Sequence, residues 1–363
     1  MSNKRLAVVC NYVLRADRIG GMDRFFVAYD KAAKAKGYEV DWFFPDVLDK
    51  TFYEGITVFS AEGNSSVEAF FLNYLQENEK TYTTLVTHFT ELCTPFYKKA
   101  KHAGRIKNLI AVDHNPRPLN GFPLKKQLKN RLKGYLHHKA IDRFIGVSSY
   151  TARHIVKDLG KVVARKTGVI YNGIDTSVFK KRENLNLNQA GKVQFVVVSH
   201  LRESKGLQYL IDALGYLEDA IKNRLHISIY GEGPLEDVLK QQAEDKGVDT
   251  LLTFKGSSSE IPQLLADYEY LIQPTYMECF SLSILESLSA NVPVITTTVG
   301  GNPEIIKESV NGFLFKPKDK WALAAIIEEV VDGDRKITED TSVLIEKEYT
   351  LDRMVAEHIN LLD

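Results

Sequence analysis

Short apolar runs of strand length alternate with segments of helical periodicity along almost the whole chain. The runs predict buried strands, and apolar residues at helical spacing, such as Phe25, Phe26 and Tyr29, predict helices between them. In the first half, the predicted strands cover residues 6–10, 39–44, 56–59, 84–88, 109–113 and 144–147. In the second half, they cover residues 193–199, 227–230, 251–256, 270–273 and 292–295.

The alternation of strand and helix in both halves predicts an α/β fold with two parallel sheets, each covered by helices on both faces. A length of 363 residues also favours two domains over one. We expect a first domain over residues 1–180, a polar linker over 180–191 and a second domain over 191–348. Ligands bind at the carboxyl ends of the strands in such sheets, so the residues that follow each strand are the candidate site residues.

The composition, with 44% hydrophobic and 26% charged residues, is that of a globular protein. The formal net charge is zero, so the overall charge gives no reason to expect a nucleic-acid partner. Cys10, Cys93 and Cys279 lack the spacing of a metal or redox site, which indicates a reducing compartment. The apolar run 6–10 is too short for a signal peptide, and no segment has bilayer-spanning length, so we expect a cytoplasmic protein.

The stretch 273–304 combines two predicted strands, a loop, a helix and a pair of carboxylates. The helix is expected to begin near Phe280, with Glu278 just before it and Glu286 near its second turn. The backbone N–H groups of Phe280, Ser281 and Leu282 would then be free at the helix N-terminus. Free N–H groups and the helix dipole together form an anion site.

The carboxylates of Glu278 and Glu286 indicate that the bound anion also has hydroxyl groups. Glu286, on the helix, can accept both hydrogens of a vicinal diol such as a ribose, and Glu278, in the loop, can accept sugar hydroxyls. Two glutamates at this spacing are, by themselves, more typical of a solvated helix face. Together with the anion site, they predict a nucleoside diphosphate sugar as the ligand.

The stretch resembles the donor-site signature of the retaining GT-B glycosyltransferases of family 4. It departs from that signature at Thr275, Ser281, Ser287 and Asn291. The resemblance implies two Rossmann-like domains facing across a cleft, with a C-terminal helix, residues 349–363, crossing back to the first domain. The positions that fit the signature are Glu278, Phe280, Leu282, Glu286, Pro293, Val294, Gly300, Gly301 and Glu304.

The loop 200–206 brings cations to the end of a predicted strand. Lysine binds phosphate as a point charge and arginine binds it as a fork. The loop resembles the family pattern Gly-Arg-Leu-x-x-x-Lys-Gly, which implies that Lys205 contacts the diphosphate. The family arginine falls on His200, so we place His200 among the donor-binding residues and Arg202 as the candidate to replace that arginine.

Four further residues enter the candidate site through the resemblance. Gly20 and Gly21 occupy the place of the family's Gly-Gly-x-Glu segment, with Asp23 for the glutamate. Gly231 lies in a Gly-x-Gly turn, and Phe254 lies in a segment whose family counterpart contacts the nucleobase. We expect all four, Gly20, Gly21, Gly231 and Phe254, to contact the donor.

Two histidines, His88 and His114, come at predicted strand ends. The resemblance implies that His114 lies near the donor sugar, whereas His88 is equally well explained as a turn residue. Asp332 and Asp334 form an Asp-x-Asp of the kind metal-dependent glycosyltransferases use, but they follow a helical run and not a strand. We interpret them as a helix-ending turn and predict no metal cofactor.

The resemblance implies a metal-independent retaining hexosyltransferase. The expected donor is a UDP-hexose or UDP-N-acetylhexosamine, and the expected acceptor is a glycan or lipid-linked molecule of cell-surface polysaccharide synthesis. Two other functions stay open on the sequence alone. One is a non-hydrolysing sugar-nucleotide epimerase of the same architecture, and the other is a non-catalytic subunit that binds a nucleotide sugar.

A basic segment lies between residues 93 and 139, where Asp113 is the only acidic residue. Within it, Leu124, Leu128, Leu132 and the pair Tyr135-Leu136 recur at helical spacing among basic residues. This pattern predicts either an interfacial helix on an anionic membrane or a helix that packs on the sheet and leaves a solvated basic face. The cations are Lys98, Lys99, Lys101, Arg105, Lys107, Arg117, Lys125, Lys126, Lys129, Arg131, Lys133 and Lys139.

Overall fold

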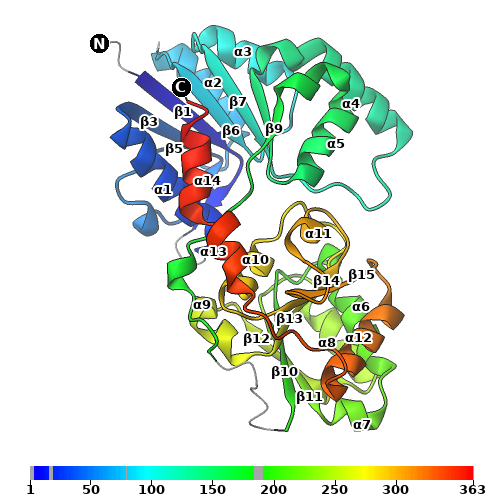
Figure 1. Ribbon diagram of the computed structural model, residues 1–363. Helices are drawn as coiled ribbons and strands as arrows, with labels where there is room; N and C mark the ends of the chain where they lie inside the picture. The colour runs from blue at the N-terminus through cyan, green and yellow to red at the C-terminus, as the bar shows by residue number, and fades with distance from the viewer. Residues whose placement is uncertain (1–3, 16–18, 79, 184–190, 363) are drawn as a thin grey trace. The chain divides into compact units, whose positions relative to one another are not determined.

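The computed structural model describes residues 4–15, 19–78, 80–183 and 191–362 (Figure 1). The chain divides into two compact units, which are described separately. The first unit contains residues 1–116, 120–173 and 351–363, and the second contains residues 117–119 and 174–350. The predicted linker over residues 180–191 falls mostly outside the described residues, because 184–190 are not among them.

The first unit is built on a parallel sheet with the order β5-β3-β1-β6-β7-β8-β9. Strand β1 (Lys4–Cys10), third in this order, is almost wholly apolar and buried from Leu6 onward, as expected for a strand covered on both faces. Val8 pairs with Trp42 on one side and Val86 on the other. The strands are β1 (Lys4–Cys10), β3 (Tyr38–Phe44), β5 (Thr57–Ser60), β6 (Thr84–His88), β7 (Asn108–Asp113), β8 (Arg143–Gly146) and β9 (Thr167–Val169), with a separate pair formed by β2 (Val13–Leu14) and β4 (Asp46–Val47).

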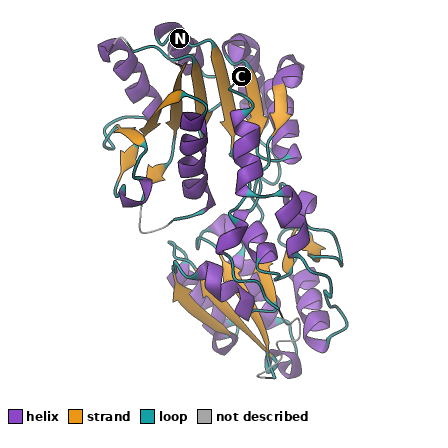
Figure 2. Ribbon diagram, turned by 60° about the vertical axis from the view of Figure 1, so that its left-hand side comes forward, coloured by secondary structure: helices purple, strands orange, loops and turns teal. Residues whose placement is uncertain are grey.

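The helices of the first unit cover both faces of this sheet (Figure 2). The last helix of the chain packs on α1 and thus belongs to the first unit, as the GT-B resemblance implies. No helix in the described part of the chain is both long and apolar enough to cross a membrane. The helices are α1 (Gly21–Ala35), α2 (Val67–Asn78), α3 (Pro95–Ala103), α4 (Leu124–His137), α5 (Ser149–Leu159) and α14 (Leu351–Ile359).

The second unit also contains a parallel sheet, with the order β12-β11-β10-β13-β14-β15. Counted along the chain, this is the order 3-2-1-4-5-6 of dinucleotide-binding folds, and the first six strands of the other unit follow it too. The strands are β10 (Val193–Val198), β11 (Leu225–Tyr230), β12 (Leu252–Gly256), β13 (Tyr270–Gln273), β14 (Val294–Thr297) and β15 (Gly312–Phe315).

Helix α12 of the second unit ends at Asp332, and Gly333 adopts the left-handed conformation that closes a helix C-terminus. This confirms that the Asp-x-Asp sequence is a helix-ending turn. Apolar residues of the sheet and of α6, α8 and α12 form one core. The helices are α6 (Leu207–Gly215), α7 (Asp219–Lys222), α8 (Glu236–Asp245), α9 (Ile261–Leu264), α10 (Leu282–Ser289), α11 (Asn302–Ile305), α12 (Lys320–Asp332) and α13 (Ser342–Glu348).

The structure confirms the α/β fold with two parallel sheets, and the predicted strands match to within about two residues, the usual uncertainty of element ends. No prediction covered the sheet-edge strands β9 and β15. Both are short and contain a glycine, Gly168 or Gly312, which weakens the strand pattern.

Candidate functional site

The site in the second unit lies where the strand order reverses. The chain leaves β10 toward one side of the sheet and leaves β13 toward the other, which is the topology at which ligands bind in such folds. The loop after β10 carries Lys205, and the loop after β13 carries Glu278. Lys205 Nζ lies 2.7 Å from Glu278 Oε2, and each side chain is 14% exposed. Lys205 and Glu278, which were predicted separately, thus meet at the carboxyl ends of two neighbouring strands, as expected.

Backbone contacts hold these two loops together. The N–H of Tyr276 donates to the carbonyl oxygen of Ser204 at 3.0 Å, and the hydroxyl of Thr275 donates to the same oxygen at 3.0 Å. Gly206 has φ of +77°, and a Cβ there would collide with the carbonyl oxygen of Pro274. Glycine is therefore required at this position both for its backbone conformation and for the close approach of the two loops. The ion pair is held by a defined backbone, which favours a preorganised site.

Helix α10 begins at Leu282, two residues later than predicted, because Ser281 keeps an extended backbone as the N-cap residue. The first turn of a helix leaves its N–H groups without acceptors inside the helix. The N–H groups without an intrahelical acceptor are therefore those of the N-cap Ser281 and of Leu282, Ser283 and Ile284. Two of the three predicted groups, Ser281 and Leu282, belong to this set, and Phe280 lies before it. Phe280 is instead a buried core residue, with its ring 5.5 Å from that of Tyr349.

Gln273, the last residue of β13, is a site residue that the sequence analysis missed. Its Nε2 donates to the hydroxyls of Ser281 at 2.7 Å and Ser283 at 2.8 Å. These bonds fix the two small residues at the start of α10. The available signal was a polar residue that ends an otherwise apolar strand and is 2% exposed.

Glu286 lies in the second turn of α10, as predicted, and is half-buried. Helical spacing places it on the same side of the helix as Leu282 and Ser283, so its carboxylate faces the same region as the helix N-terminus. The Gly300-Gly301 turn lies against the Glu278 loop, since the N–H of Gly301 donates to the Cys279 carbonyl oxygen at 2.9 Å. At this end of the sheet, the Lys205–Glu278 pair is thus set on close backbone packing between the loops.

The remaining predicted donor residues lie around the same strand ends. His200 and Arg202 are exposed on the loop after β10. Gly231 follows β11 with φ of +128°, and a Cβ there would collide with the carbonyl oxygen of Ser199, so glycine lets the two loops approach. Phe254 packs against the hydrophobic core, with Lys240 Nζ 5.4 Å from the centre of its ring. Donor contacts by these four residues stay predictions.

The equivalent edge of the first unit carries a buried histidine pair. His88 ends β6, His114 follows β7, and His88 Nδ1 lies 3.0 Å from His114 Nε2. Burial lowers the pKa of His88 well below its usual value and that of His114 to about 3. Phe89 stacks on His114 and has φ of +59°, a strained conformation for a bulky residue. The pair is neutral at physiological pH, and His88 is a core partner of His114 and not a simple turn residue.

Gly20 and Gly21 lie at the start of α1, and Asp23 stands where the family segment has glutamate. Asp23 Oδ2 accepts from the N–H of Gly20 at 2.8 Å, and Asp23 also accepts from the hydroxyls of Tyr12 and Tyr53. Burial raises the pKa of Asp23. The carboxylate thus caps the helix, and the predicted donor contacts of Gly20 and Gly21 stay predictions, as does that of His114.

The loops after β10 and β13, together with the start of α10, can hold an anion and hydroxyl groups with no contribution from a metal ion. Lys205 supplies positive charge, the start of α10 supplies N–H donors, and Glu278 and Glu286 supply acceptors. Among residues 4–15, 19–78, 80–183 and 191–362, no group of three or more His, Cys, Asp or Glu side chains is arranged to hold a metal ion.

Comparisons with known proteins match both units. The family described as glycosyl transferases group 1 matches residues 178–348, and glycosyltransferase family 4 matches residues 19–178. An uncharacterized glycosyltransferase of Methanocaldococcus jannaschii is 28% identical over 214 residues, which are 54% of this chain and 53% of the relative. N-acetyl-alpha-D-glucosaminyl L-malate synthase of Bacillus anthracis is 26% identical over 160 residues, which are 43% of this chain and 42% of the relative.

These matches span about half the length of the curated relatives or less. The match to a solved structure is longer. The crystal structure of Anabaena HepE in complex with UDP and glucose has a TM-score of 0.77 and 22% identity, and the match covers 99% of both chains. That likeness shows the fold. With both halves matched by family models, the chain belongs to the group 1 glycosyltransferases and has the GT-B fold.

Proposed function

We propose that this glycosyltransferase moves a sugar from a UDP-hexose or UDP-N-acetylhexosamine to a glycan or lipid-linked acceptor, with retention of anomeric configuration and without a metal ion. The proposal rests above all on the Lys205–Glu278 pair at the edge where the strand order reverses. The UDP complex of Anabaena HepE, a protein of the same fold, supports uracil as the base. Synthesis of a cell-surface polysaccharide is the role we expect for such an acceptor.

In the proposed reaction, the bond between the anomeric carbon and the diphosphate oxygen breaks. The acceptor hydroxyl oxygen bonds to the same face of that carbon, and its proton leaves with the diphosphate. Lys205 and the N–H groups at the start of α10 would stabilise the negative charge that develops on the leaving group. Glu278 would hold sugar hydroxyls, and Glu286 would accept from the ribose. Arg202 is the second cation we assign to the diphosphate.

The test is incubation of the purified protein with a panel of sugar nucleotides and no acceptor, followed by addition of candidate glycan and lipid acceptors. Slow release of UDP and free sugar, and a product whose anomeric configuration equals that of the donor, support the proposal. An isomerised sugar nucleotide would instead identify an epimerase. Binding of nucleotide without turnover on any acceptor would identify a non-catalytic subunit.

We further propose that helix α4 brings the first unit to an anionic membrane surface, where a lipid-linked acceptor would be found. The apolar residues of α4 face outward: Leu124, Leu128, Leu132 and Tyr135 are between 58% and 77% exposed. At 100° per residue they lie within about 80° of the helix circumference. The structure thus contradicts the alternative that this stripe packs on the sheet.

The opposite side of α4 is the one that contacts the protein, although it is not apolar. It carries Gln127, Asn130 and Gly134, and a Cβ on Gly134 would collide with the Leu159 carbonyl at the end of α5. Lys125 and Lys129 flank the exposed stripe on one side, and Arg131 flanks it on the other. An outward apolar stripe between cations matches the chemistry of an anionic bilayer, where each cation adds about 1 kcal/mol.

Vesicle co-sedimentation tests this part of the proposal. Binding should rise with the anionic lipid fraction, fall with salt and drop at least about tenfold in the variant Lys125→Glu/Lys129→Glu/Arg131→Glu. Lys133 is left intact because it pairs with Glu91. Leu128→Ser should weaken binding, whereas Leu48→Ser, at a residue of the same unit that is 63% exposed, is the matched control. A protein that ignores anionic vesicles at low salt would favour a soluble acceptor.

A further inference from the structure

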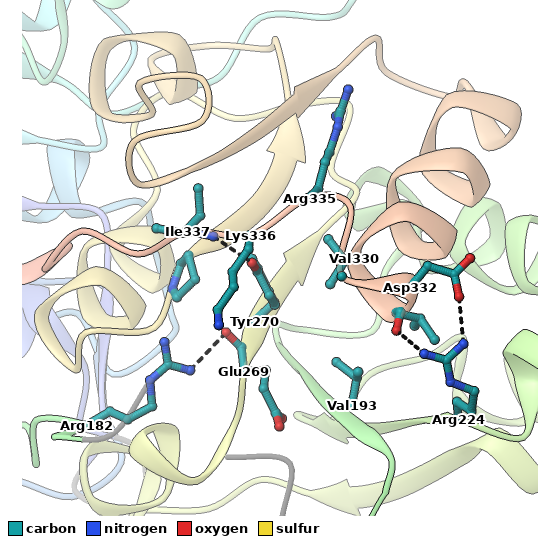
Figure 3. A pocket seen from close by; sticks show the side chains of 13 residues that line it. Arg182, Val193, Arg224, Glu269, Tyr270, Val330, Asp332, Arg335, Lys336 and Ile337 are labelled. Carbon is teal, nitrogen blue, oxygen red and sulfur yellow. Dashed lines mark hydrogen bonds and ion pairs between the residues drawn. The ribbon is translucent and has the colours of Figure 1, made fainter. Parts of the chain in front are cut away.

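Helix α10 is tied to strand β13 at both of its ends. At the C-terminal end of the helix, the N–H of Arg182 donates to the Ala290 carbonyl oxygen at 2.9 Å. The guanidinium of Arg182 also donates, at 3.1 Å, to the backbone oxygen of Glu269, the residue that precedes β13 (Figure 3). At the N-terminal end, Gln273, the last residue of β13, donates to two serine hydroxyls. The start of α10 is therefore held in one place relative to the sheet.

The side-chain amide of Gln273 has one favourable orientation. Its Nε2 lies 2.7 Å from Ser281 Oγ and 2.8 Å from Ser283 Oγ, so one N–H hydrogen is available for each hydroxyl. Gln273 is 2% exposed, and within the described ranges its Oε1 has no hydrogen-bond partner. The reverse orientation would leave two buried N–H hydrogens without acceptors in place of one oxygen, which costs more. The amide therefore donates to both serines.

The two serine hydroxyls consequently direct their hydrogens away from Gln273. Ser281 Oγ and Ser283 Oγ lie 3.1 Å apart, so one hydroxyl donates to the other and one hydrogen remains. Ser281 is 3% exposed, so a hydrogen left on its oxygen would be buried without an acceptor among the described residues. Ser281 therefore donates to Ser283, and the half-buried Ser283 keeps the hydroxyl hydrogen that a ligand can accept.

Ser283 is the second residue of α10, so its hydroxyl and its backbone N–H both belong to the first turn. A hydroxyl oxygen that already accepts two hydrogen bonds acts towards a ligand as a donor, which suits an anion. In the proposed reaction, Glu278, before α10, holds the sugar, and Glu286, in the second turn, holds the ribose. The diphosphate joins the sugar to the ribose and would therefore pass the first turn, where Ser283 lies.

We infer that Gln273 is a positioning residue that makes Ser283 a side-chain donor to the diphosphate of the nucleotide sugar. The inference rests on the proposed function and adds a contact to the proposed site. It also explains one departure from the family signature, because Ser281 links the amide of Gln273 to the hydroxyl of Ser283. The diphosphate would thus be met by a hydroxyl as well as by the N–H groups at the start of α10 and by Lys205.

The experiment is calorimetric titration of the full chain with UDP and, separately, with uridine, which has no phosphate. Gln273→Met removes the amide and keeps the length of the side chain, and Ser283→Ala removes the hydroxyl. Each variant should lose at least about tenfold in UDP affinity, the effect of one hydrogen bond to a charged group, and keep uridine affinity within about twofold. Gln241→Met, at an exposed residue of α8, is the matched control. Equal losses of UDP and uridine affinity would show a structural role only and would overturn the inference.

The double variant Gln273→Met/Ser283→Ala shows whether Gln273 acts through Ser283. Its UDP affinity should lie within about threefold of that of Ser283→Ala, because no hydroxyl is left for the amide to orient. Losses that multiply to about a hundredfold would mean that the two residues act independently, which would contradict the inference.

Thermal unfolding without nucleotide checks that the variants fold. Gln273→Glu is the second variant at this position, because it keeps the shape of the side chain. Its carboxylate accepts from both hydroxyls and turns their hydrogens inward, so it should lose at least as much UDP affinity as Gln273→Met.

Failure of this inference can be told apart from failure of the proposed function. A wild type that binds UDP, with Gln273→Met and Gln273→Glu binding it equally well, would overturn the role of Gln273 alone. A wild type that binds no UDP would overturn the proposed donor and this inference together. None of these readouts requires glycosyl transfer.

Discussion

The two units share one strand order but differ in what they place where that order reverses. In the second unit, the loops after β10 and β13 meet in the Lys205–Glu278 ion pair, which is still reached by solvent. In the first unit, the corresponding strands are β1 and β6, and the N–H of Asn11 donates to the carbonyl oxygen of His88 at their ends. There, His88 and His114 are buried and neutral; Phe89 stacks on His114, and Phe25 meets His88 edge-on.

The strand ends of the two units therefore suit different ligands, although both units have the same strand order. A pair of opposite charges, a helix N-terminus and nearby carboxylates suit a nucleoside diphosphate with its hydroxyls. Two neutral imidazoles that bond to each other leave one donor and one acceptor nitrogen, which suits uncharged hydroxyl groups. Fold alone therefore does not determine what a switch point binds; the side chains at its strand ends do.

The largest expected effect comes from removing the cation. Lys205→Ala should lower kcat/KM by about 100- to 1000-fold, or about 3–4 kcal/mol, because one preorganised donor to the leaving group is lost. Steady-state transfer or donor hydrolysis measures this. Lys347→Ala is the control of equal size on an exposed surface.

Lys205→Ala also leaves Glu278 without its ion-pair partner, so stability must be measured beside activity. The double variant Lys205→Ala/Glu278→Gln removes that unpaired charge. If activity returns to within about threefold of wild type in the double variant, the pair serves structure only and the electrostatic role of Lys205 is wrong.

The buried histidines of the first unit predict a smaller effect, a fall in folding stability at low pH. His358 of α14 packs its ring 4.8 Å from that of Phe25, and burial lowers its pKa to about 4. The unfolded chain takes up this proton near pH 6.5, whereas the folded chain does so only near pH 4. Stability is therefore complete above pH 7 and is lost as the pH falls, by about 1 kcal/mol between pH 7 and 5.5 for this residue.

The variant His358→Phe keeps an aromatic ring in the cluster and removes the titration. Urea unfolding of wild type and variant at pH 7 and 5.5 should show that the variant loses about 1 kcal/mol less. His102→Gln, at an exposed histidine, should leave the pH dependence as it is. Equal pH dependence in wild type and His358→Phe would mean that His358 is not held neutral.

The sequence was enough to predict the sheets and the ends of their central strands, because apolar runs followed by loop residues mark both. It could not predict that Lys205 reaches Glu278, since these residues are 73 positions apart and meet only through the strand order. The start of α10 was misplaced because nothing in the apolar spacing shows that Ser281 stays extended. For α4, the leucine spacing shows a stripe but not which side of the helix the protein covers.

The smallest expected effect is that of a chelator. Excess EDTA should leave the transfer rate within about twofold of the untreated enzyme, since Lys205 and the start of α10 supply the positive potential that a metal would provide. Assays with EDTA, and then with added Mg²⁺ or Mn²⁺, measure this. Activity that vanishes with EDTA and returns with either ion would refute metal-independent transfer.

Calorimetric titration with UDP tests the central claim, which is that the loops after β10 and β13 and the helix α10 bind the donor. Wild type should bind UDP; Glu286→Ala should lose about tenfold or more in affinity because the ribose loses a charged acceptor. Glu278→Ala should bind UDP within about threefold of wild type yet lose turnover, because its predicted contact is with the sugar. Equal losses of UDP affinity in the two variants, or a wild type that binds no nucleoside diphosphate, would contradict the account.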